Sequence, residues 1–213
     1  MKKTSAVFLG LILGLGTVLI LAAQDQPLPE DPYKRGLVLL GEFKFQEAHD
    51  SFNQVLSQDR KHKDALYYRG KSLIGLNLLD EAQKDFNRIK KIDSESPLSY
   101  LGSAEVLIQK KELENAQAML NQAKEYSSEH PEVFYLQGVI QGYQKNTEGA
   151  MSSFQKCIEI KPDHAYAHYQ LGLAYYQMKR SDMTLTHFEK FLKLAPEAPE
   201  APQVRNLLNF IRR

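Results

Sequence analysis

The sequence has a single cysteine, Cys157, and no excess of either charge. One cysteine cannot form an internal disulfide, so a fold held together by disulfides is excluded. Lys and Arg total 27 and Asp and Glu total 26, and this balance argues against a nucleic-acid-binding surface, which needs a clustered basic excess. Hydrophobic residues still make up 43% of the chain, which is enough to build a folded core.

The sequence motifs of common catalytic sites are also missing. No serine lies in a nucleophile-elbow pattern, and no histidine pair has the two-turn zinc spacing with a glutamate. Residues 65–72, ALYYRGKS, end like a phosphate-binding loop, but Ala65 occupies the place of that loop's first glycine. The sequence therefore predicts a protein that is not an enzyme and uses no cofactor and no metal.

The one long uncharged stretch is residues 6–23, which follows Lys2 and Lys3. This order, basic then apolar then polar, is typical of an export signal. We expect a signal over residues 1–23, cut after Ala23, and a linker over residues 24–28. An uncleaved anchor is the alternative, because the apolar run has about the length of a short membrane span. A cleaved signal and an uncleaved anchor both predict a bacterial protein that works outside the cytoplasm, either in the periplasm or held in the inner membrane.

Three columns of residues recur every 34 positions. Two columns hold small residues, and the third holds bulky apolar ones. The columns are Gly36, Gly70, Ala104, Gly138 and Gly172; Ala48, Ala82, Ala116, Ala150 and Thr184; and Phe52, Phe86, Leu120, Phe154 and Phe188. Five copies in phase predict five repeats, at residues 29–62, 63–96, 97–130, 131–164 and 165–198.

Each repeat contains two stretches with apolar residues at helical spacing. The small residues allow two antiparallel helices to cross closely, which explains why a helix interior accepts glycine. Residues 199–213 follow the last repeat, and Val204, Leu207, Leu208 and Ile211 share one face of a further helix. The sequence thus predicts an all-α solenoid of five helix-turn-helix units with a C-terminal capping helix.

With this period and these residues, the chain resembles the tetratricopeptide repeat (TPR) family. In the last repeat the family's characteristic places hold Leu171, Gly172, Tyr175, Phe188 and Pro196. Thr184 departs from the pattern, as do Arg35 and Arg60 in the first repeat. The resemblance covers residues 29–198. It implies a right-handed superhelix whose first helices line a concave groove that receives peptides or helices of other proteins.

One face of the first helices is the candidate groove surface. Four of the five repeats have tyrosine at their fifth position, and residues four and seven places later share its helical face. The predicted groove residues are Tyr33, Leu37, Tyr67, Lys71, Ile74, Leu101, Glu105, Ile108, Tyr135, Val139, Tyr169, Leu173 and Tyr176. Two interpretations stay open: these side chains contact a partner segment, or they only pack the array.

The residue types at the predicted groove positions also indicate the kind of partner. Family members that hold a terminal carboxylate use lysines, arginine and asparagines, whereas the matching places here hold tyrosines, leucines, Lys71 and Glu105. An amphipathic helix or an extended apolar peptide is the expected ligand. We expect a scaffold for assembly of a cell-envelope complex. A membrane-tethered protein that self-associates and an accessory subunit of an envelope enzyme complex are the alternatives, and the oligomeric state stays open.

One short stretch, residues 157–168, could be interpreted as a metal or thiol site because it holds Cys157, His164 and His168. The positions equivalent to Cys157 in the other repeats are apolar, and buried cysteine behaves as a small hydrophobe. His164 falls in a turn between repeats and His168 on a core-facing position of the next helix. Three residues on different faces do not converge as metal ligands must, so the stretch is interpreted as a seam between repeats.

Overall fold

The computed structural model describes residues 27–212, and within this range it contains eleven helices and no strand. The helices are α1 (Pro32–Gly41), α2 (Phe45–Gln58), α3 (Lys63–Gly75), α4 (Leu79–Ile92), α5 (Pro97–Gln109), α6 (Leu113–Tyr126), α7 (Pro131–Tyr143), α8 (Thr147–Ile160), α9 (Ala165–Gln177), α10 (Ser181–Leu194) and α11 (Ala201–Ile211). The predicted all-α fold is confirmed.

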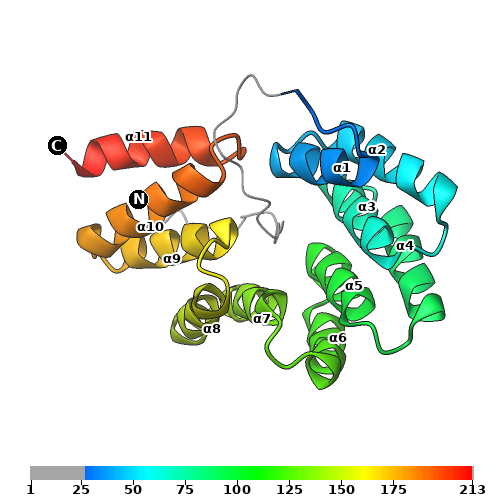
Figure 1. Ribbon diagram of the computed structural model, residues 1–213. Coiled ribbons are helices and arrows are strands. Elements are labelled where there is room, and N and C mark those ends of the chain that lie inside the picture. Colours follow the sequence, from blue (N-terminus) through cyan, green and yellow to red (C-terminus); the bar gives the residue numbers. More distant parts are fainter. Residues whose placement is uncertain (1–26, 213) are drawn as a thin grey trace.

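Successive helices pack as pairs, α1 with α2 through α9 with α10, and each pair packs on the next. Figure 1 shows these pairs arranged along an arc, with α3, α5 and α7 toward its inside and α4, α6 and α8 toward its outside. The first helices of the first four units also contact one another directly. One face of α1, α3, α5, α7 and α9 therefore follows the inside of the arc.

Within each glycine-bearing unit the glycine lies against the phenylalanine 16 residues later. A Cβ atom on Gly70 would lie 2.5 Å from the Phe86 ring, and one on Gly138 would lie 2.6 Å from the Phe154 ring. Phe86 also contacts Gly102 at the start of the next unit. The small and bulky columns of the sequence are thus the two sides of one helix crossing.

The turn inside each unit is a Schellman motif made without glycine. The residue in the left-handed region, with φ between 58° and 62°, is Phe43, Asn77, Lys111, Lys145 or Lys179. In the first unit the N–H of Lys44 bonds the carbonyl of Leu39, and the N–H of Phe43 bonds that of Leu40, which are the two bonds of the motif. Two of the carbonyls that end α1 are satisfied in this way.

Histidine caps the first helix of three units. The Nδ1 atom of His62 accepts from the N–H of Ala65, and the Nδ1 of His164 accepts from the N–H of Ala167 at 3.1 Å. His130 does the same for α7. Histidine is not among the usual capping residues, so the residue types at these positions did not indicate the caps.

The array ends at α11, which packs on α10. Ala201, Val204 and Leu208 are buried, while Phe210 is 73% exposed. None of the helices between residues 27 and 212 combines the length and hydropathy needed to cross a membrane. The predicted signal at residues 1–23 lies outside the described residues.

Candidate protein-binding face

The structure divides the thirteen predicted groove residues by their exposure. Nine are buried: Tyr67, Lys71, Ile74, Leu101, Glu105, Ile108, Tyr135, Val139 and Tyr169. Tyr33, Leu37 and Leu173 are partly buried, and Tyr176 is 43% exposed. The buried residues come mainly from the second to fourth units, so the accessible ones lie at the two ends of the array. Whether the face binds a segment stays a prediction.

Tyr67 and Tyr135 are the groove tyrosines of the second and fourth units. Tyr135 is fully buried, with its ring 4.6 Å from that of His164 and 5.9 Å from that of Phe154. Tyr67 is 5% exposed and packs on Phe86. Both side chains are therefore part of the core in this structure, as the interpretation that they pack the array expects.

Lys71 and Glu105, expected to offer opposite charges to a partner, form an ion pair with each other. They lie 34 residues apart, at the same place in successive units, and each side chain is 1% exposed. Burial raises the pKa of Glu105 to about 7 even though Lys71 opposes that effect. A buried pair of this kind needs its hydrogen bonds in place, because each charge has lost its water.

A second buried pair joins Glu132, at the start of α7, to His164, at the start of α9. The His164 Nε2 atom lies 3.2 Å from the carboxylate. Because a backbone N–H can only donate, the Nδ1 of His164 is an acceptor, and its proton sits on Nε2 and is donated to Glu132. Burial acts to raise the pKa of Glu132, but His164 and Lys71 outweigh it and lower that pKa to about 2.

The first and fifth units also meet. The ring of Phe43, in the turn between α1 and α2, packs edge-on against Tyr166 of α9 at 6.3 Å between centroids. The Tyr166 hydroxyl donates to Glu200 beyond α10. The contact joins residues more than three units apart in the sequence, so the array curves far enough to bring its first and fifth units together at this point. This curvature was not predicted.

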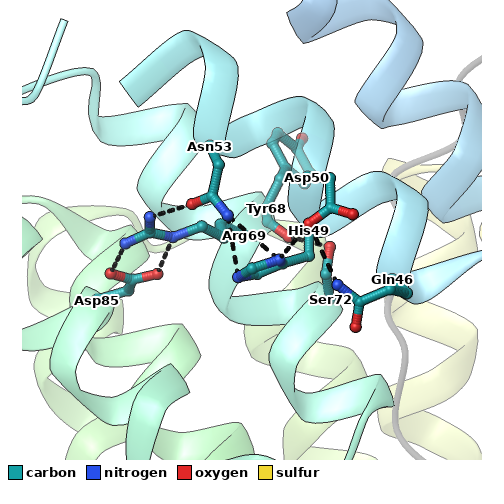
Figure 2. Close-up of polar contacts among 8 residues, drawn as sticks. All are labelled: Gln46, His49, Asp50, Asn53, Tyr68, Arg69, Ser72 and Asp85. Atoms are coloured by element: carbon teal, nitrogen blue, oxygen red, sulfur yellow. Dashed lines mark hydrogen bonds and ion pairs between the residues drawn. The ribbon is translucent and has the colours of Figure 1, made fainter. Parts of the chain in front are cut away.

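A separate polar network involves the seventh residue of the first four units. The TPR pattern expects leucine at this position, and this chain has it only in the fifth unit. The five residues are Arg35, Arg69, Ser103, Gln137 and Leu171. Figure 2 shows Arg69 of α3 between Asn53 of α2 and Asp85 of α4. The Arg69 guanidinium donates twice to Asp85, at 2.5 and 2.7 Å. His49 extends the network through its contact with Asn53. These bonds tie successive units together, and the sequence had shown only that Arg35 departs from the pattern.

The stretch from Cys157 to His168 makes packing and hydrogen-bond contacts between the fourth and fifth units. Cys157 is fully buried, and burial raises the pKa of its thiol. The Nδ1 of His168 lies 3.0 Å from the Nδ1 of His187, and its Nε2 contacts the carbonyl of Pro162. Among residues 27–212 no group of three histidine, cysteine, aspartate or glutamate side chains could hold a metal. The three residues serve packing and capping roles in the seam.

Family models match two parts of the chain. A tetratricopeptide repeat model matches residues 33–97, a second one matches residues 166–198, and a model described as a TPR repeat matches residues 143–179. None of the curated proteins matches the sequence. The family matches leave out most of the third unit and the start of the fourth, and the third unit is the one that departs from the glycine and phenylalanine columns.

Several solved structures share the fold. A thermophilic TPR protein of Thermus thermophilus, TTC0263, matches with a TM-score of 0.68 and 18% identity, over 85% of this chain and 97% of that chain. A tetratricopeptide repeat protein from Parabacteroides merdae ATCC 43184 matches with a TM-score of 0.69 and 16% identity, over 85% and 70%. The APC/C hetero-tetramer Cut9–Hcn1 contains a chain that matches with a TM-score of 0.67 and 19% identity, over 84% and 35%.

Proposed function

Because the chain belongs to the tetratricopeptide repeat family, we propose that it is a non-catalytic scaffold that binds a segment of another protein. The observation that carries the proposal is the repeated face of the first helices, of which α3, α5 and α7 lie toward the inside of the arc (Figure 1). The two ends of this face keep exposed apolar and tyrosine surface. Repeat arrays typically use such continuous concave surfaces for binding.

The accessible ends of this face are where we expect the partner to make first contact. Tyr33 and Leu37 in the first unit, and Leu173 and Tyr176 in the fifth, retain exposed surface. Tyr176 also lines a hollow with Phe210 and Thr184 between α9, α10 and α11. Apolar and aromatic side chains suit an amphipathic helix or an extended apolar peptide.

We place this activity in the bacterial cell envelope, as part of the assembly of an envelope complex. The support is the order of Lys2, Lys3 and the apolar residues 6–23. The intact mass of the protein from an expressing bacterium tests the location. A mature form that begins near Gln24 supports export with cleavage, and a membrane-bound form that retains Met1 supports the anchor. A full-length form in the cytosol would contradict both.

Capture from a bacterial envelope extract tests the scaffold function. The full chain is the bait, and bound proteins are identified by mass spectrometry. A variant with Tyr33 and Tyr176 both changed to alanine is the matched bait, because these tyrosines retain exposed surface on the proposed face. We expect one partner to be retained by the wild type and lost by the variant. Equal capture by both baits would count against the proposed face.

A self-associating structural role is the second candidate, and the exposed end of the array favours it. Phe210, Met178 and Tyr176 are among the most exposed large apolar side chains of residues 27–212. Size-exclusion chromatography with light scattering separates the two functions. A monomer at micromolar concentration supports partner binding, whereas an oligomer that dissociates on Phe210→Ser supports self-association.

A further inference from the structure

Three buried oxygen atoms in the middle of the concave face have no hydrogen-bond partner within residues 27–212. They are the Oε1 of Glu105, the Oε2 of Glu132 and the hydroxyl of Tyr135. All three side chains belong to buried residues, at most 5% exposed, and come from the adjacent first helices α5 and α7. A buried polar atom without a partner is costly, so each one calls for an explanation.

The three oxygens lie in one region. The ring of Tyr135 lies 4.6 Å from that of His164, whose Nε2 lies 3.2 Å from the Glu132 carboxylate. Glu132 and Glu105 also raise the pKa of the Tyr135 hydroxyl, after the larger effect of burial. Glu132 also raises the pKa of Glu105. Yet the Tyr135 hydroxyl donates to neither carboxylate. Each of the three oxygens therefore keeps an acceptor position that a hydrogen-bond donor could use.

The charge of this region is not balanced. Lys71 neutralises Glu105 through their ion pair. The Nδ1 of His164 accepts from a backbone N–H, so its Nε2 proton is the only one it can donate to Glu132. Lys71, which also lowers the pKa of Glu132, is therefore the one lysine beside two buried carboxylates. A buried net negative charge is unfavourable unless a cation joins it. The missing group should thus carry both donors and a positive charge.

We propose that Glu105, Glu132 and Tyr135 form a site for the ammonium or guanidinium group of a lysine or arginine side chain on the partner segment. The inference rests on the proposed function and refines it, since the apolar parts of the segment would lie on the ends of the face and one basic side chain would enter its middle. Charge-assisted bonds to carboxylates are the strongest hydrogen bonds such a segment could make.

Selection of short random peptides on the full-length protein tests the site and does not require the natural partner to be identified. We expect the selected peptides to carry lysine or arginine at one fixed place among apolar residues. Replacing that arginine by citrulline, which keeps the shape and removes the charge, should weaken binding to the wild-type protein by about 10-fold or more. The comparison uses the unaltered protein, so it does not depend on whether a variant folds.

Glu132→Gln then locates the effect, because glutamine keeps an acceptor for His164 and removes the charge. On this variant the arginine and citrulline peptides should differ by no more than about 2-fold. Glu159→Gln, which removes an exposed carboxylate on α8, is the control and should behave as the wild type.

The other outcomes overturn the inference in different ways. Selected peptides that show no basic preference, or that bind equally with citrulline, would mean that the three oxygens hold only water, and the proposed function would stand. An unchanged citrulline effect on Glu132→Gln would place the basic group elsewhere. If no peptide is selected at all, the proposed function fails and the basic-side-chain site fails with it.

Discussion

The same helical face has two different characters in the middle of the array and at its ends. Tyr33 and Tyr135 occupy the fifth position of the first and fourth units, but Tyr33 is only partly buried whereas Tyr135 is enclosed. Position in the repeat therefore does not decide what a residue does. The neighbouring elements contribute to it, because an inner unit is covered by units on both sides, whereas Tyr169 of the last unit is buried against Phe188 and Phe191 of its own unit.

The charged side chains of this face also differ between the middle of the array and its ends. The middle holds the buried pairs of Lys71 with Glu105 and of His164 with Glu132. The ends offer aromatic and aliphatic surface at Tyr176 and Leu37. A partner would meet an apolar surface first and the charged middle only if it enters the arc.

Truncation of the two equivalent tyrosines should have unequal effects on stability. Tyr135→Ala removes a fully buried ring that packs on Phe154 and His164, so it should lower the free energy of unfolding by about 3–5 kcal/mol. Tyr33→Ala should cost less than half as much, because its ring is partly in water already. Chemical denaturation of both variants measures the difference. Equal losses would remove the distinction between middle and end.

Substitution of Gly138, at the helix crossing in the fourth unit, should give the next largest loss of stability. Gly138→Leu forces side-chain atoms into the space of Phe154, whose ring would lie 2.6 Å from a new Cβ, and overpacking costs about 1–3 kcal/mol. The third unit has Ala104 with Leu120 at the equivalent places. Gly138→Ala should therefore be destabilising alone, and Phe154→Leu should offset part of that loss in the double variant. Additive losses in a thermal scan would contradict the crossing.

The sequence predicted the regular part of the structure well. Glycine and phenylalanine columns identified the close helix crossings, because a crossing needs residues of those sizes at a fixed spacing. The turns were found only as breaks in the helical pattern, since Phe43 and Lys145 occupy left-handed positions where glycine is usual. Capping by His62 was missed for a similar reason.

The candidate site was less predictable because it depends on the curvature of the whole array. Helical spacing placed Lys71 and Glu105 on one face, but their pairing requires two successive units to approach closely. The contact of Phe43 with Tyr166 joins the first and fifth units, and no local pattern encodes such a distance. Small rotations between units accumulate along a solenoid, so burial of the middle of the face emerges only in three dimensions.

Acid should loosen the last units before the first. Burial lowers the pKa values of His130 and His168, and it lowers that of His187 to about 4. Between about pH 4 and 6.5 these three histidines bind fewer protons in the folded state than in the unfolded state, so the stability that they contribute is lost as the pH falls through this window. Glu105, whose pKa is raised to about 7, has the opposite effect in the middle of the array. Lys190 adds to the effect on His168, and Asp163 opposes it. Hydrogen exchange at about pH 7 and pH 5 would show which helices open first.

A matched variant tests whether the pair of His168 and His187 causes the acid sensitivity of the last units. His168→Phe introduces the residue that the fourth unit has at the equivalent place, Phe134, and it leaves His187 without a second ring nitrogen beside it. The melting temperature of this variant should fall less between about pH 7 and pH 5 than that of the wild type. An identical fall would assign the acid sensitivity to His130 or to the carboxylates.

The smallest effect on stability is expected at Tyr176, where the effect on binding should be clear. Its side chain is 43% exposed, and exposed substitutions usually change stability by no more than about 0.5 kcal/mol. Interface aromatics that anchor a ligand typically cost about 2 kcal/mol when truncated. Tyr176→Ala should therefore keep its melting temperature and lose captured partner. Tyr126→Ala is the matched control, because Tyr126 is equally exposed, at 42%, but lies on α6 at the outside of the arc. If both variants retain the partner equally, the end of the inner face does not bind it, and the contrast between middle and end would concern folding alone.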